Sequence, residues 1–339
     1  MHQWLAARCT QPALRAAYIG GLTCFVVGFV AQALFAAIGR LQGLIQHDMR
    51  TKGRPEFYGY SIAYFDTNVY ISLTKKPGSW KSLQEFLCEN NLLLGVSDTN
   101  VLELSLSPDL HADLARFLLQ VPSALLKPAA QIMEDEVKAY LRDTEVNPLV
   151  GPITPLVLES DNPVGTLVES LFQRELITSI RSAMIEQKPA FEKRIQDTRE
   201  NFLPIVNPER YTENDGPYYA FQLVWLQILC NDWPICARRI KEKIEGSQEM
   251  RPTLPPHFKG LRLFALAQFY RYHLHRKAPE GNDYGDFLQV VPIPYCRVAV
   301  VEETLSNELR HIRRHDPVLQ HTEVHKLDFL RELTGLDLG

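Results

Sequence analysis

Acidic residues follow short apolar runs in this chain, and each acid comes just before or within a stretch with helical spacing. The apolar run Ser61–Phe65 ends at Asp66, and the run at residues 92–97 precedes a stretch that contains Glu103. Short buried strands that alternate with helices predict a parallel sheet with helices on its faces. Because ligands bind at the carboxyl ends of such strands, we expect Asp66 and, about one helical turn further on, Glu103 at that edge.

The same pattern returns near the end of the chain. The β-branched run at residues 297–301 predicts a strand that ends at Glu302, with a helix directly after it. Asp283 and Asp286 lie before this strand, at the start of another predicted helix. The two regions are far apart in the sequence, and we expect them to form one α/β sheet with acids along one edge.

The segment between these regions, at about residues 110–275, has mostly helical periodicity and predicts a large helical insertion. Its breaks carry proline or glycine, which end helices. The predicted helices cover residues 112–119, 129–141, 167–184, 191–202, 218–230, 234–245 and 258–275.

The acids predict a metal site if the fold brings them together. Several carboxylates at one place repel one another and lose hydration, so their convergence costs stability unless cations compensate. Hard oxygen ligands suit Mg²⁺ or Mn²⁺ rather than zinc. The candidate ligands are Asp66, Glu103, Asp283, Asp286 and Glu302.

Three sequence blocks carry a resemblance to a known family. FDTNVYISL from Phe65, SDTNVLEL from Ser97 and NDYGDFLQVVPIPYCRVAVVEETL from Asn282 resemble the signature blocks of PIN-domain ribonucleases, in that order. The resemblance covers about a third of the chain. It implies a PIN-like parallel sheet flanked by helices over residues 61–339, interrupted by the helical insertion, and it implies metal-dependent endoribonuclease activity.

The resemblance also implies a role for each acid. Asp66, Glu103, Asp283 and Glu302 take the catalytic, metal-holding positions, with Asp286 as an additional acid. Relatives usually carry aspartate where this chain has Glu302. The alternative is therefore a degenerate member that binds nucleic acid or protein without cutting. A third interpretation is a phosphatase or DNA nuclease on the same scaffold.

The implied substrate, RNA, is polyanionic, so cations must lie near the acids. Arg271, Arg276 and Lys277 precede the third block and are the candidates closest to it in sequence. Asn68, just after Asp66, is expected to orient a carboxylate or phosphate. The alternative for Asn68 is a helix cap.

The amino-terminal region departs from the rest of the chain. A run without charged residues begins at Ala16 and ends at Ile38. About 20 such residues span the ~30 Å hydrocarbon layer of a membrane. We expect a transmembrane helix within residues 1–40 and a connector at residues 41–60. The alternatives are a signal peptide, a buried helix, or an upstream start codon.

The implied chemistry decides the orientation of this anchor. A catalytic domain that meets RNA and Mg²⁺ must face the cytoplasm, so we expect a single-pass protein of the inner or plasma membrane. A cytoplasmic chain is the alternative.

Composition excludes other classes of protein. The net charge of -4 excludes a uniformly basic nucleic-acid packaging protein, and the six cysteines include no CxxC pair, which excludes a zinc ribbon. His311 and His315 have a spacing that can place ligands on one helical face. No partner motif accompanies them, so we expect an exposed amphipathic helix. The acidic run at residues 134–136 is expected on a solvated helical face.

Overall fold

A six-stranded sheet forms the centre of the molecule, in the order β4-β3-β2-β1-β5-β6. The computed structural model describes residues 60–105, 107–152, 212–230, 254–275, 277 and 283–334. Five strands run parallel, and β4 pairs with β3 antiparallel. The expected α/β class, a parallel sheet flanked by helices, is confirmed. The strands are β1 Ser61–Phe65, β2 Leu92–Val96, β3 Ser123–Leu126, β4 Leu149–Pro152, β5 Val298–Val300 and β6 Glu323–His325.

The central strands are apolar along their whole length because both faces of the sheet are covered. Alternate residues of β1 belong to different cores: Ile62 and Tyr64 pack in one cluster, Ala63 and Phe65 in the other. Gly95 of β2 allows a close approach, since a Cβ built there would lie 2.7 Å from the Ile62 Cγ2 atom. The side chain of Ile62, on the neighbouring strand, thus fills the space that a side chain at position 95 would need.

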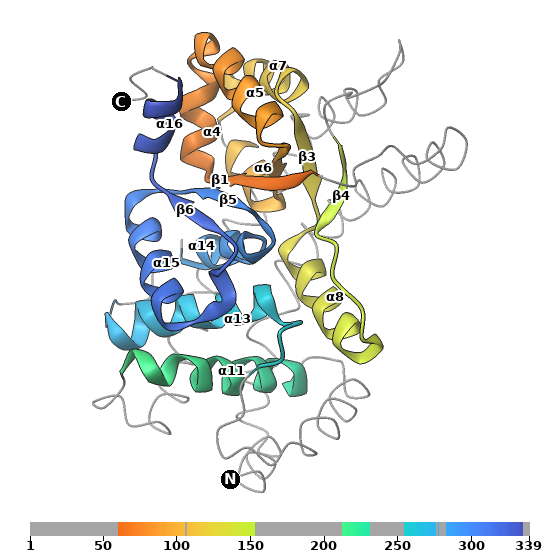
Figure 1. The fold of residues 1–339 in the computed structure, drawn as a ribbon, viewed down its shortest axis with the longest axis vertical. Coiled ribbons are helices and arrows are strands. Elements are labelled where there is room, and N and C mark those ends of the chain that lie inside the picture. The colour runs from red at the N-terminus through yellow and green to blue at the C-terminus, as the bar shows by residue number, and fades with distance from the viewer. Residues whose placement is uncertain are drawn as a thin grey trace, which may run out of the picture.

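Helices cover both faces of this sheet (Figure 1). One face carries α4 Thr67–Thr74, α5 Trp80–Glu89, α6 Asp98–Ser105, α7 His111–Gln120 and α16 Asp328–Thr334. The other carries α8 Ala129–Arg142, α11 Gly216–Cys230, α13 Lys259–Gln268, α14 Asp283–Val290 and α15 Glu303–His315. Short helical turns join them: η1 Pro77–Ser79, η2 Pro108–Leu110, η5 Glu213–Asp215, η7 Ile293–Tyr295, η8 Pro317–Leu319 and the π-helical segment η6 Phe269–Leu274.

The middle of the chain is less purely helical than expected. Strands β3 and β4 lie within residues 110–275 and extend the same sheet, although α7, α8, α11 and α13 fall where helices are predicted. The helix predicted for residues 258–275 is divided between α13 and η6, where the chain changes to π-helical bonding. The helices predicted at 167–184, 191–202 and 234–245 lie outside the described residues.

The predicted membrane segment, residues 1–40, and the predicted connector, residues 41–60, also lie outside the described residues, except for Tyr60 at the end of the connector. Among the helices that are described, none has the length and apolar character needed to cross a bilayer.

The acidic run of α8 corrects another expectation. Glu134 and Asp135 pair with lysines near the surface, but Glu136 is fully buried. Its carboxylate accepts the backbone N–H groups of Gly260 and Leu261, in the first turn of α13, and the hydroxyl of Tyr295. A solvated face was therefore the wrong prediction for Glu136, because this side chain satisfies the otherwise unpaired donors at the start of a buried helix.

Candidate functional site

Asp66 joins the ends of two neighbouring strands. It directly follows β1 at the N-cap position of α4, with extended backbone, and is 5% exposed. Its Oδ2 atom accepts the backbone N–H of Glu302, the second residue after β5, at 3.2 Å. Because β1 and β5 are parallel neighbours, the carboxyl ends of both strands meet at this aspartate.

Asn100 connects the second sequence block to the first. It is fully buried, and its side-chain amide donates to the Phe65 carbonyl and to the Thr67 Oγ1 atom, both at 3.2 Å. Its Oδ1 atom accepts from Ser97, at 3.1 Å from the backbone nitrogen and 2.8 Å from the hydroxyl. The turn after β2 thereby fixes the turn after β1, which carries Asp66.

Glu103 lies in α6, beside this network. Its carboxylate is hydrogen-bonded to the side chains of Thr67 and Gln289. One of its oxygens would lie 3.5 Å from a Cβ built at Gly285 of α14, so the third sequence block approaches it closely. Gln289 of α14 thus contacts a candidate ligand.

The acids at this edge repel one another. Burial raises the pKa of Glu103 to about 7, and the charges of Asp66 and Asp286 add to the rise. Burial also raises the pKa of Asp66, against the lowering effect of the Glu302 N–H, and Asp286 raises it further. The pKa of Glu302 is raised by burial and then by Asp66 and Asp286. We call these four coupled residues the acid cluster: Asp66, Glu103, Asp286 and Glu302.

The other side of Asp286 faces a buried cation, Arg271 of η6. The Arg271 Nη1 atom lies 2.9 Å from Asp283 Oδ1 and 2.8 Å from Asp286 Oδ2. Its Nη2 atom lies 3.4 Å from Glu308 of α15, and the guanidinium stacks on the ring of Phe287. Burial alone would lower the pKa of Arg271, but the surrounding carboxylates raise it well above its usual value.

The five acids therefore have different environments. Asp283 is 1% exposed and is bound by Arg271, by the Tyr272 hydroxyl at 2.9 Å and by Lys277 at 3.4 Å. Its carboxylate belongs to a salt-bridge network, which Asp286 shares through Arg271. Among the described residues, no three of these acids place carboxylate oxygens within 4.8 Å of one another.

The candidate RNA-binding residues also differ from one another. Asn68 is exposed in the first turn of α4, as a substrate contact requires. Lys277 pairs with Asp283 but remains 45% exposed, and Arg276 lies outside the described residues. The expectation that Arg271 contacts the RNA backbone is wrong, because this residue is only 7% exposed to solvent and is bound to carboxylates, so it cannot meet a phosphate. Its position inside the apolar run of residues 263–274 is the sequence signal for a buried arginine with acidic partners.

Chemically, the acid cluster offers a set of hard oxygen donors. The four carboxylates come from the ends of β1 and β5 and from α6 and α14. Burial, and after it the neighbouring acids, raise the pKa values of Asp66, Glu103 and Glu302. Carboxylate oxygens are the type of ligand that Mg²⁺ and Mn²⁺ bind together with water and substrate phosphates.

The molecule was compared with known proteins at three levels. No protein-family model, no curated protein and no solved structure matches this chain. Functional assignment therefore rests on the residues and their geometry.

Proposed function

We propose that this chain is a metal-dependent endoribonuclease that hydrolyses RNA phosphodiester bonds at the acid cluster. The observation that supports the proposal is the placement of acids at the carboxyl edge of a parallel sheet, where Asp66 accepts the Glu302 N–H and Glu103 approaches Gly285, next to Asp286. Ligands gather at this edge in α/β proteins, and the hard oxygens of carboxylates there suit a divalent cation.

Each acid has a defined task in this mechanism. Bound Mg²⁺ or Mn²⁺ would lower the pKa of a coordinated water and stabilise charge on the phosphate oxygens. Asp66, held by the Glu302 N–H, would keep a fixed orientation as a ligand. Glu103, held by Thr67 and Gln289, would supply the second carboxylate ligand. Asp286 and Glu302 would supply two further carboxylates that are more exposed to solvent. Asp283 would orient α14 through Arg271 rather than ligate directly.

Exposed groups beside the cluster would receive the substrate. Lys277 is half-exposed and close enough to Glu302 to lower the pKa of that carboxyl, so it lies on the open side of the cluster. We assign Lys277 and Asn68, with Arg276 next to Lys277 in sequence, to contacts with the RNA backbone.

The test is a cleavage assay on fluorescent single-stranded RNA with the full-length chain in Mg²⁺ or Mn²⁺. Asp66→Asn should lower the rate at least ~100-fold, since loss of even an indirect metal contact commonly costs 10–100-fold. Glu89→Gln, at an exposed acid of α5, is the matched control and should cut like the unmodified protein. Equal rates for Asp66→Asn and the unmodified chain would sink the enzyme proposal. Single-stranded DNA and nucleotides offered in parallel separate a DNA nuclease and a phosphatase from a ribonuclease.

One observation favours a second function, a binding module that does not cut. Arg271 already neutralises Asp283 and Asp286, so part of the charge that a metal would compensate is compensated by the protein. Such a module should bind RNA equally well in EDTA and in Mg²⁺, with no cleavage in either. Cleavage that EDTA abolishes would exclude it.

We further propose that residues 16–38 anchor the chain in the inner or plasma membrane with the catalytic domain in the cytoplasm. Fractionation tests this, because a spanning chain resists high salt and is released by detergent. Release by salt alone would contradict the anchor.

A further inference from the structure

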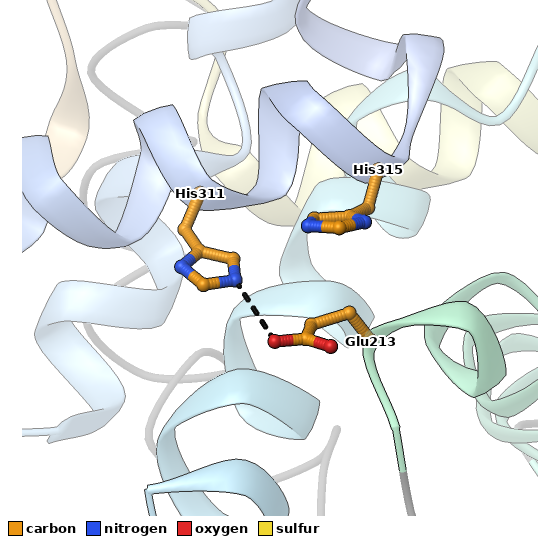
Figure 2. A group of neighbouring side chains, drawn as sticks. All are labelled: Glu213, His311 and His315. Carbon is orange, nitrogen blue, oxygen red and sulfur yellow. Dashed lines mark ion pairs between the residues drawn. The ribbon is translucent and has the colours of Figure 1, made fainter.

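A second group of metal-ligating side chains lies at the opposite end of α15 from Glu302. His311 and His315 are one helical turn apart on α15, and Glu213 begins the short helix η5 (Figure 2). One ligand atom from each residue lies within 4.8 Å of the others. The His311 Nε2 atom is 3.3 Å from Glu213 Oε1, and the two imidazole rings stack at a centroid distance of 5.3 Å.

The short turn that carries Glu213 is fixed by a capping box. Thr212 and Asp215 form a capping box around Glu213, with the Thr212 backbone nitrogen 2.9 Å and its hydroxyl 3.0 Å from Asp215 Oδ2. The pKa of Glu213 lies below its ordinary value, first because a backbone N–H donates to the carboxylate and then because of His311. Figure 2 shows the Glu213 carboxylate directed toward the two histidines.

One imidazole is also fixed by packing. The His311 ring meets the ring of Tyr270 edge-on at 5.2 Å, and the His311 side chain is 34% exposed. His315 is exposed next to it, so the group opens to solvent on one side. Figure 2 shows both rings on the face of α15 that is turned toward Glu213.

We propose that Glu213, His311 and His315 form a binding site for a borderline divalent metal, with Zn²⁺ as the expected ion. Two imidazole nitrogens and one carboxylate oxygen are a set of three protein ligands that leaves a fourth tetrahedral position for water or another donor. Nitrogen donors separate this site from the acid cluster, whose oxygens suit Mg²⁺ or Mn²⁺.

The position on α15 also favours a cation. His311 and His315 lie in the last turns of the helix, where the partial negative charge of the backbone dipole is greatest. Arg313 and Arg314 lie in the same turn and oppose this effect. The carboxylate of Glu213, 3.3 Å from His311, places a negative charge beside the histidines that offsets the arginines.

Metal binding would join two parts of the chain that are distant in sequence. Helix α15 packs beside the end of β6, whereas η5 leads directly into α11. A shared ion would fasten α11 to α15 independently of the sheet. This inference goes beyond the proposed nuclease activity and does not depend on it.

The test is metal binding by the purified full-length chain after removal of metal by a chelator. Zn²⁺ is titrated against a chromophoric chelator, and Co²⁺ is added separately to report ligand geometry by its visible absorption. The unmodified chain should bind one equivalent at this site with tetrahedral Co²⁺ bands. His315→Ala and Glu213→Gln should each weaken binding at least tenfold and remove those bands.

Two further variants keep the test specific. His321→Ala, at an exposed histidine outside the group, should bind like the unmodified chain. Asp66→Asn should also bind Zn²⁺ at this site like the unmodified chain. A loss of RNA cleavage in Asp66→Asn and a loss of Zn²⁺ binding in His315→Ala are therefore independent results. Unchanged Zn²⁺ affinity in both His315→Ala and Glu213→Gln, or loss of the Co²⁺ bands in Asp66→Asn alone, would overturn the proposal.

Discussion

Glu103→Gln should stabilise the chain in the absence of divalent metal. The pKa of Glu103 is about 7 against an ordinary 4.5, chiefly because of burial. A difference of about 2.5 in pKa corresponds to about 3 kcal/mol of unfolding free energy once the group is ionised in both the folded and the unfolded chain. Glutamine has the same shape and can keep hydrogen bonds to Thr67 and Gln289, so the substitution removes the charge and retains the contacts.

The sign and the pH window follow from the direction of the shift. Because the pKa is higher in the folded chain, the folded chain holds its proton to higher pH, and stability falls as pH rises from about 4.5 to about 7. The gain from Glu103→Gln should therefore be about 1 kcal/mol at pH 5.5 and about 2–3 kcal/mol at pH 8, after allowance for partial exposure. At roughly 2 °C per kcal/mol for a chain of this size, the Tm should rise by about 5 °C at pH 8.

The change in Tm is measured by thermal unfolding monitored with circular dichroism, in EDTA and in Mg²⁺, at both pH values. Mg²⁺ should raise the Tm of the unmodified chain more than that of Glu103→Gln, because ligand binding stabilises only the form that binds. Glu89→Gln serves as the control and should change the Tm by less than about 1 °C. Two results would refute the interpretation of Glu103 as a buried carboxyl whose charge destabilises the fold. One is a Glu103→Gln protein that unfolds at a lower temperature than the unmodified chain at pH 8 in EDTA, and the other is the same change in Tm at both pH values.

Three other substitutions test how the scaffold is held. Glu136→Ala should cost about 4 kcal/mol in urea unfolding, because two backbone donors of α13 and a tyrosine hydroxyl lose their acceptor; a cost below 1 kcal/mol would contradict the capping role. Asn100→Ala should cost about 2–3 kcal/mol and slow RNA cleavage, since the turn that carries Asp66 loses its support; unchanged cleavage would separate Asn100 from the site. Gly260→Ala should cost about 2–3 kcal/mol by calorimetry, because its Cβ would lie 2.8 Å from the Val291 backbone oxygen; a neutral effect would mean that this backbone can move.

The sequence predicted those parts of the fold that depend on short-range patterns. Strands β1, β2 and β5 are apolar runs, and α15 has helical spacing directly after its strand, so each can be identified locally. Strands β3 and β4 were missed because Ser123–Leu126 and Leu149–Pro152 have four residues each and lie next to proline or glycine, which indicate turns. Their pairing is decided by the neighbouring strand, which a local pattern does not contain.

The sequence predicted those site residues that directly follow strands, but not the partners that come from distant segments. Acids after strands had to lie at one edge of a parallel sheet, and Asp66 and Glu302 do. The role of Asp283 could not be read in the same way, because its partner Arg271 comes from a π-helical segment whose side-chain directions differ from those of an α-helix. The partner of His311, Glu213, lies on a helix far earlier in the sequence, so the histidine spacing alone indicated an ordinary exposed helix face.

Helix α15 links the two proposed metal sites and explains why they can act separately. Glu302 is its N-cap residue, and His311 and His315 lie about 14–20 Å away at 1.5 Å per residue. That distance is about two Debye lengths in physiological salt, so the charges of two exposed sites are largely screened from each other. Direct repulsion between the ions is therefore small, and coupling between the sites would have to pass through the position of α15. Since Glu308 in the middle of this helix is bound to Arg271, and Arg271 to Asp286, a movement of α15 that accompanies Zn²⁺ binding would reach the acid cluster through that buried arginine.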